Sequence, residues 1–193
     1  VAGEMGVVLP GVRIRDNLGL APHAYRLKIA GSEVARGRVY PDKLLAVCRQ
    51  ANVELLAGEL AEDPQSGHTA VWIDHQLRSQ AATLGYRLLE PVGVLTAHLK
   101  TIALQYADEL LTRDAVSHLV DELRKISPVV VDELIPEIMT LSAVQHVLQM
   151  LLREGITIRP LATVLETLAD HAPESSDPVR LVEQVRQRLA RTI

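Results

Sequence analysis

The chain has 193 residues, a hydrophobic fraction of 48% and a formal net charge of −4. This length suits one large domain or two to three compact subdomains, and the apolar fraction predicts a packed core rather than disorder. The core must be aliphatic, because there is no Phe, one Trp and four Tyr. The acidic balance argues against a general nucleic-acid binder, which would carry a basic patch.

The single cysteine, Cys48, excludes an intrachain disulfide and fits a reducing compartment. It lies in the apolar run LLAVC, so a small core residue is a simpler interpretation than a reactive thiol. No apolar run reaches the roughly 18 residues that a membrane span needs, and the N-terminus does not resemble a signal peptide. Because the chain begins with Val1 and not Met, we expect it to be a fragment of a longer protein.

The first third of the chain is predicted to be β structure. In VRIRDNL, residues 12–18, apolar side chains stand among charges. Residues 25–29 alternate between apolar and basic side chains, which is typical of a half-buried strand. A turn containing Gly31 follows, and residues 34–40 return, so the pair predicts a hairpin. Residues 43–48 continue as a strand or a short helix.

The middle of the chain predicts a β/α unit. Residues 49–68 are less regular, and EDPQSGH, residues 62–68, is a predicted loop because it combines Asp-Pro with Gly. The expected elements after it are a buried strand at 70–73, a helix at 75–84 with Asp74 as N-cap and Gly85 as its stop, and a strand at 86–90.

From Pro91 onward the sequence predicts helices. The expected helices span residues 92–111, 113–125, 142–154, 158–169 and 178 to the end, and the first of them places Val94, Leu95, His98, Leu99, Ile102 and Tyr106 near one face. Asp114 is a candidate cap, and Asp177-Pro178 fits an N-cap followed by Pro at the first helical position. Pro136 is either a kink or the first turn of a new helix. The predicted fold class is therefore α+β, with small β/α-containing subdomains in the N-terminal half followed by an all-helical subdomain.

The sequence offers no positive sign of catalysis or of a bound cofactor or metal. No HExxH, GxSxG or phosphate-binding glycine motif occurs. Asp114, His118 and Glu122 fall at i, i+4 and i+8 and could ligate a metal, but a solvated helix face is the simpler interpretation. His98 is best explained as a satisfied histidine in the core or at a subdomain boundary. We therefore predict that the protein is not an enzyme.

Several stretches resemble the cytoplasmic domain of the flagellar and injectisome export gate proteins, the FlhA/SctV family. They are VRIRDNLGL (12–20), GSEVARGRVYPDKLLAV (31–47), DPQSGHTAVWID (63–74), LTAHL (95–99), VLQMLLREGITIRPLATVLETLADHAP (147–173) and SDPVRLVEQVRQRLARTI (176–193). The likeness spans the whole chain from about Gly3, and the amino-acid sequence of these stretches favours the flagellar branch.

The resemblance implies a domain plan and a role. The first subdomain would be residues 1–41 plus 91–110, the second, inserted β/α subdomain 42–90, and the third, helical one 111–193. A fourth subdomain and a transmembrane part would lie outside this chain. Such proteins form a nine-membered ring at the cytoplasmic face of the bacterial inner membrane, where they receive export chaperones with their substrates and contact other proteins of the apparatus.

The resemblance also implies a partner-binding dimple between the first two subdomains. Its motif is an Asp-Pro-Ala-Phe-Gly loop plus a Thr before His-Leu. Here Asp63, Pro64 and Gly67 match, whereas Ser66 stands at the Phe position and Ala97 at the Thr position, beside Thr96. Either the dimple is built differently, around Leu89, Val94 and Leu95, or the partner differs. Asp63 itself could bind a partner or simply form an Asx turn.

These observations predict a non-enzymatic platform of the flagellar type III export apparatus that docks chaperone–substrate complexes. One alternative is the injectisome counterpart, which would dock virulence substrates. A nucleic-acid-binding module is a second alternative, since a β/α unit joined to helices can resemble one, and a hydrolase of unknown type is a third.

Overall fold

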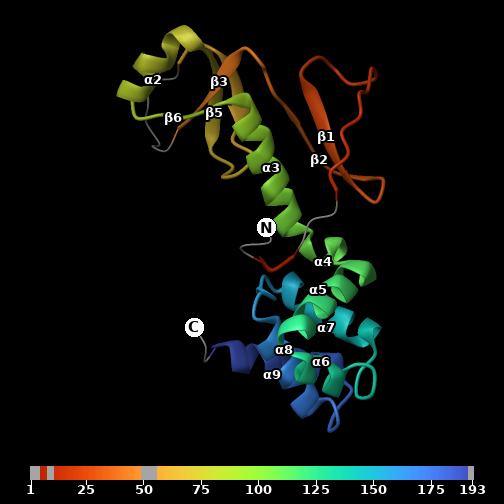
Figure 1. The fold of residues 1–193 in the computed structure, drawn as a ribbon. Coiled ribbons are helices and arrows are strands. Elements are labelled where there is room, and N and C mark those ends of the chain that lie inside the picture. The colour runs from red at the N-terminus through yellow and green to blue at the C-terminus, as the bar shows by residue number, and fades with distance from the viewer. Residues whose placement is uncertain (1–4, 8–10, 49–55, 191–193) are drawn as a thin grey trace. The chain divides into compact units, whose positions relative to one another are not determined.

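The computed structural model describes residues 5–7, 11–48 and 56–190 (Figure 1). It contains two compact units, a mixed unit, Arg13–Ile102, and a helical unit, Val1–Val12 with Ala103–Ile193. Every described strand belongs to the mixed unit. The predicted α+β class, with strands first and helices after, is confirmed. The subdomain boundaries at 41/42 and 90/91 fall inside the mixed unit and stay a prediction.

The predicted hairpin is present in the mixed unit. Strands β1 (Ala24–Ile29) and β2 (Ser32–Arg38) are antiparallel and are joined by Ala30 and Gly31, both with positive φ. The half-buried residues alternate along β1 as predicted: Tyr25, Leu27 and Ile29. The β prediction is wrong for residues 12–18, which form no strand. The large apolar side chains of that segment, Val12, Ile14 and Leu18, are exposed, because they have no sheet to pack against among the described residues.

A four-stranded antiparallel sheet forms the centre of the mixed unit. Its order is β4 (Glu59–Glu62), β5 (Thr69–Asp74), β3 (Lys43–Val47) and β6 (Arg87–Leu89). The segment predicted as strand or helix at 43–48 is thus a strand, and the strands predicted at 70–73 and 86–90 are confirmed. Strand β4 was missed within the stretch predicted to be less regular, of which residues 49–55 lie outside the described residues.

The two faces of this sheet bury separate apolar clusters, because neighbouring residues of β3 point to opposite sides. Leu44 and Ala46 pack with Val71, Ile73, Ala81 and Tyr86 on the face that α2 (Arg78–Thr83) covers. Cys48 packs against this cluster, as predicted for a small core residue. Leu45, Val47 and Trp72 pack on the other face with Val94 of α3 (Pro91–Gln105) and, half-buried, Val39 and Tyr40 after β2.

The helix predicted at 75–84 is split into a 3-10 turn, His75–Leu77, and α2. Asp74 occupies the N-cap position with an extended backbone, but its side chain makes no capping hydrogen bond, so that part of the prediction is wrong. The stop at Gly85 is confirmed, with φ of 80°. The N–H groups of Gly85 and Tyr86 donate to the carbonyls of Ala82 and Ala81, which is the Schellman arrangement.

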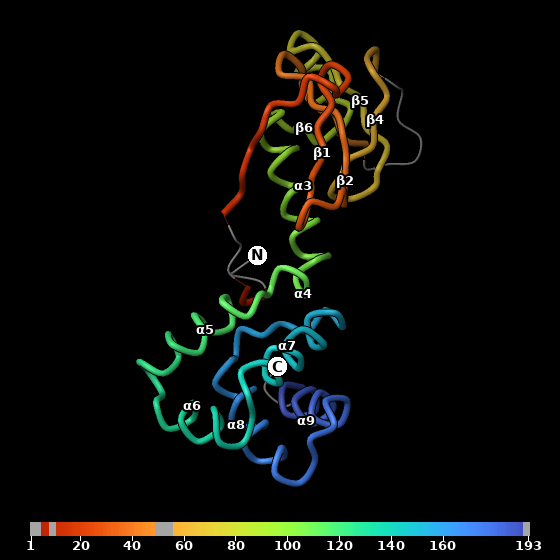
Figure 2. Tube along the Cα trace, turned by 90° about the vertical axis from the view of Figure 1, so that its right-hand side faces the viewer, coloured from red at the N-terminus to blue at the C-terminus, as the bar shows by residue number. Residues whose placement is uncertain are grey.

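The helical unit gathers the remaining helices (Figures 1 and 2). They are α4 (Ala107–Leu110), α5 (Arg113–Ile126), α6 (Pro128–Leu134), α7 (Leu141–Arg153), α8 (Leu161–His171) and α9 (Pro178–Ala190). Their apolar faces share one aliphatic core, which includes Leu134, Leu148, Leu151, Leu165 and Leu168. The continuous helix predicted at 92–111 is instead broken at Tyr106, between α3 and α4.

The helix ends confirm some predictions and correct others. Thr112 caps α5 by accepting from the Ala115 N–H at 3.2 Å, so the cap is not Asp114, which lies in the first turn. Pro136 is neither a kink nor a helix start, since α6 ends at Leu134 and the Ile135–Pro136 bond is cis. Helix α8 begins at Leu161 rather than at residue 158. Asp177 accepts from the Val179 N–H at 3.0 Å, so the predicted cap of α9 is confirmed; residues 191–193 lie outside the described residues.

Candidate docking surface

The loop between β4 and β5 is closed by its own backbone. The carbonyl of Asp63 accepts from the N–H groups of Ser66 and Gly67 at 3.2 and 2.8 Å, and the Asp63 N–H donates to the His68 carbonyl at 2.9 Å. Gly67 has a φ of 69°, in the left-handed region that favours glycine. The loop predicted at 62–68 is therefore a tight turn, except that Glu62 still belongs to β4.

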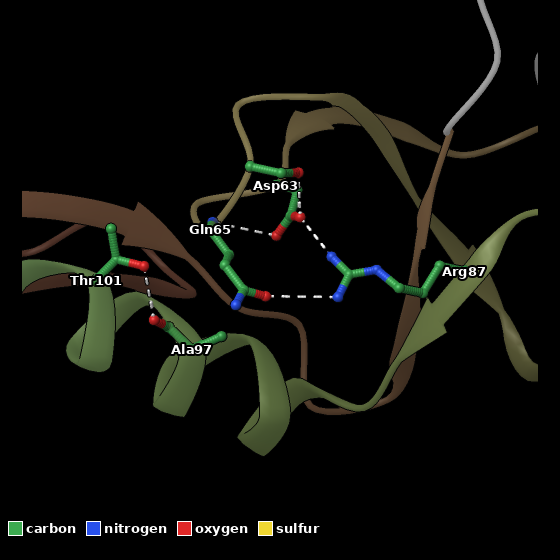
Figure 3. A network of polar contacts seen from close by, with 6 residues as sticks. Asp63, Gln65, Arg87, Ala97 and Thr101 are labelled. Atoms are coloured by element: carbon green, nitrogen blue, oxygen red, sulfur yellow. Dashed lines mark hydrogen bonds and ion pairs between the residues drawn. The ribbon is translucent and has the colours of Figure 1, made fainter. Parts of the chain in front are cut away.

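The carboxylate of Asp63 is turned inward and is 0% exposed. Its Oδ1 accepts from the Gln65 N–H at 3.2 Å, and its Oδ2 accepts from Ser66 Oγ and from Arg87 Nη2, each at 2.6 Å. Arg87 Nη1 also reaches Gln65 Oε1 at 3.5 Å. Figure 3 shows Asp63, Gln65 and Arg87 pointing toward one another. Of the two roles considered for Asp63, the Asx turn is present. The Asp63 side chain, which the resemblance suggested for partner contact, is enclosed.

The first turns of α3 place the other expected residues at different depths. Val94 is 2% exposed and belongs to the sheet core, and Leu89 packs half-buried against the same cluster. Leu95 is 37% exposed, although it was predicted to share the apolar face with Val94. Ala97 is half-buried, and its carbonyl accepts from Thr101 Oγ at 3.1 Å (Figure 3). The neighbouring Thr96 is exposed, and its hydroxyl donates to the Val92 carbonyl at 2.8 Å.

A cavity of about 430 Å³ lies beside this loop in the mixed unit. Pro64 of the loop and Val94 and His98 of α3 all line it, so the loop and the first turns of α3 are neighbours. Its charged lining comes from two strands, with Arg36 and Arg38 on β2 and Glu59 and Glu62 on β4. Sequence reasoning missed this cavity, because no pattern in the sequence marked β4 as a strand facing the hairpin.

His98 is a satisfied buried histidine, as predicted. Its Nδ1 lies 2.6 Å from the Tyr25 hydroxyl, and it is 8% exposed. Burial lowers the pKa of His98 from its ordinary value and raises the pKa of Tyr25 to about 12. Both shifts favour the neutral forms of the two side chains. The pair therefore joins strand β1 of the hairpin to α3.

The row of Asp114, His118 and Glu122 lies on α5, which matches a charged helix face. Glu122 pairs with Lys125 at 2.5 Å, and this cation lowers the pKa of the Glu122 carboxyl. Among residues 5–7, 11–48 and 56–190, no group of three or more His, Cys, Asp or Glu side chains could hold a metal ion. Within the same ranges, no helix is both long and apolar enough to cross a membrane.

The chain matches the FHIPEP family over residues 1–193. It is 40% identical over 192 residues to the flagellar biosynthesis protein FlhA of Yersinia enterocolitica, covering 100% of this chain and 28% of that protein. Its fold is similar to CdsV in the complex of CdsV and CdsO from Chlamydia pneumoniae, with a TM-score of 0.82 and 22% identity over 97% of this chain and 55% of that one. It is also similar to nonameric EPEC SctV-C, with a TM-score of 0.70 and 22% identity over 98% and 57% of the two chains. The chain thus spans about 28% of the length of its FlhA relative, and it belongs to the FHIPEP family.

Proposed function

We propose that this chain is a docking platform of the flagellar type III protein export apparatus, receives complexes of export chaperones with their substrates, and is not an enzyme. The observation that carries the proposal is the exposure of Leu95 on α3. It follows Val94, which lines the same cavity as Pro64 of the hydrogen-bonded loop 63–67. Family membership and the name of the FlhA relative support the flagellar assignment. The injectisome counterpart remains the alternative, supported by fold likeness at lower identity.

The docking surface, as we define it, combines the loop 63–67 with the first turns of α3. Val92 and Leu95 on that helix are 76% and 37% exposed. Full burial of an aliphatic side chain contributes about 1.5–3 kcal/mol. Covering these two side chains would therefore contribute favourably to the free energy of binding a partner. Since Ser66 stands where the family motif has Phe, Leu95 takes over as the main apolar contact in this proposal.

The other expected residues act from behind this surface. Val94 and Leu89 pack α3 and β6 against the sheet core. Ala97, with only a methyl group as its side chain, adds little bulk to the next turn of the helix. Gly67 permits the turn, and Pro64 stiffens it. Asp63 shapes the loop through its enclosed carboxylate rather than by touching the partner.

The setting of the whole protein is inferred from its relatives. A structure of the related SctV-C is nonameric, and CdsV has been seen in complex with CdsO. We infer that the parent of this chain forms a nine-membered ring at the cytoplasmic face of the bacterial inner membrane and contacts other proteins of the export apparatus there. The chain itself supplies the mixed and helical units of that ring.

Calorimetric titration with a flagellar chaperone–substrate complex from the same organism tests the proposal. We expect micromolar binding that is weakened about tenfold in Leu95→Ala, since truncating a central apolar contact typically costs 1–2 kcal/mol. Val129→Ala is the matched control, because Val129 is 74% exposed but lies on α6 of the helical unit. Equal affinities for the two variants would contradict the proposed surface.

A further inference from the structure

The two parts of the proposed docking surface are joined by one side chain. Arg87 is the first residue of β6, which leads through Glu90 into α3. In the sheet register Arg87 lies opposite Val47, and Val47 lies opposite Ala70, which directly follows Thr69 at the end of the loop. The guanidinium therefore reaches across the end of β3 from the strand that precedes α3 to the loop 63–67.

The charges explain why this contact is strong. Asp63 is 0% exposed, and Arg87 is the cation that pairs with its carboxylate among the described residues. A buried carboxylate without its cation is strongly disfavoured, because neither water nor another charge compensates it. The planar guanidinium also presents two nitrogens, one to Asp63 and one to Gln65, which a lysine ammonium could not do with the same geometry.

We infer that Arg87 is the positioning residue of the docking surface: it fixes loop 63–67 relative to the first turns of α3 before a partner arrives. This inference rests on the proposed function. A loop held in its bound conformation loses less conformational freedom on binding, so the partner binds more tightly without touching Arg87. Hydrogen bonds within the loop join the Asp63 side chain to Ser66 Oγ and to the Gln65 N–H. Gln65, Ser66 and Gly67 stay exposed, whereas Pro64 is half-buried.

Three variants of the 193-residue chain separate this role from general stability. Arg87→Met removes the charge and keeps an unbranched apolar stem, whereas Arg87→Lys keeps the charge and loses the planar guanidinium with its several donors. Arg78→Met is the control, because Arg78 forms an exposed ion pair with Glu90 at 3.0 Å and does not contact the loop. Exposed pairs of this kind contribute little.

The first measurement is amide hydrogen exchange of the free protein. The N–H groups of Ser66 and Gly67 donate to the Asp63 carbonyl, so they report on the loop itself. We expect Arg87→Met to speed their exchange about tenfold more than it speeds exchange of the β3 and β5 amides, with an intermediate effect of Arg87→Lys. Unchanged exchange at Ser66 and Gly67 would overturn the inference.

The second measurement is titration of each variant with the same chaperone–substrate complex. We expect affinity to fall about tenfold in Arg87→Met, to be partly restored in Arg87→Lys and to be unchanged in Arg78→Met. Faster loop exchange with unchanged affinity, while Leu95→Ala still weakens binding, would overturn the positioning role alone. If wild-type protein fails to bind, or if Leu95→Ala is also harmless, the proposed docking function fails and the positioning role fails with it.

Discussion

Replacing Asp63 by Ala should destabilise the mixed unit far more than a loop substitution normally does. The carboxylate accepts from the Gln65 N–H, from Ser66 Oγ and from Arg87 Nη2, all within 3.2 Å. Alanine leaves these three donors without their acceptor and leaves the guanidinium without its counter-charge. Because the Arg87 side chain is 29% exposed, water can reach it only in part.

The size of the loss follows from those contacts. Hydrogen bonds to charged groups contribute roughly 1.5–3 kcal/mol each, but water compensates the exposed donors, so we expect a loss of about 3 kcal/mol in the free energy of unfolding. Urea unfolding followed by the fluorescence of Trp72 measures it, since Trp72 is the sole tryptophan and is 2% exposed in the mixed unit. With an m-value of roughly 1.5–3 kcal/mol per molar, the midpoint should fall by about 1–2 M.

Two further variants make this result interpretable. Asp63→Asn keeps an oxygen acceptor and loses the charge, so it should fall between wild type and Asp63→Ala. Asp42→Ala removes an exposed aspartate from the turn before β3, and it should change stability by less than about 0.5 kcal/mol. If Asp63→Ala is as mild as Asp42→Ala, the enclosed carboxylate does not stabilise the loop and the reasoning is refuted.

Three other predictions concern the stability of the same unit. Unfolded His98 takes up a proton near its ordinary pKa of 6.5 while the folded residue resists it, so stability should fall as pH drops below about 6.5. Unfolded Tyr25 loses its proton near 10.0 while folded Tyr25 keeps it to about 12, so stability should also fall between these values, and Tyr25→Phe should remove that alkaline loss in urea titrations. Gly58→Ala should cost about 2–3 kcal/mol, because its Cβ would lie 2.2 Å from the Trp72 carbonyl oxygen. At Gly93 an added Cβ would have no atom within 4 Å apart from its chain neighbours and the backbone of its own helix, so Gly93→Ala should be neutral or stabilising by melting temperature. Equal effects of the two substitutions would contradict the steric argument.

The elements predicted most accurately are those whose structure follows from a single hydrophobic periodicity. The amphipathic helix α7 was predicted at 142–154 and spans Leu141–Arg153, because its buried positions recur with helical spacing. The hairpin was predicted from alternation in β1, because one face of this strand is covered and the other meets water. Its turn at Ala30 and Gly31 contains the glycine that its backbone favours.

The predictions were wrong where the structure depends on a choice between two nearby capping residues, or on pairing with a strand that is distant in the sequence. Strand β4 was not predicted, because it lies at the sheet edge and has no apolar alternation. Of its four residues only Ala61 is half-buried. Thr112 caps α5 although Asp114 is also a good capping residue, since the choice depends on where the chain leaves the preceding turn.

For the candidate site, the loop was predicted from composition, but the enclosure of Asp63 was not. Its partner Arg87 is 24 residues away, and the two meet only because β5, β3 and β6 pair in this register. The exposure of Leu95 next to the buried Val94 likewise depends on which side of α3 the sheet covers.

The order of the four-stranded sheet has a consequence for solubility at high local concentration. Its edge strands, β4 and β6, have four and three residues. Glu59 and Glu62 bound β4, and Arg87 begins β6. Short, charged edges resist adding a strand from another molecule, which is the usual route to β aggregation. The mixed unit can therefore expose the apolar side chains of Val92 and Leu95 on α3 without its four-stranded sheet pairing edge to edge with that of another molecule.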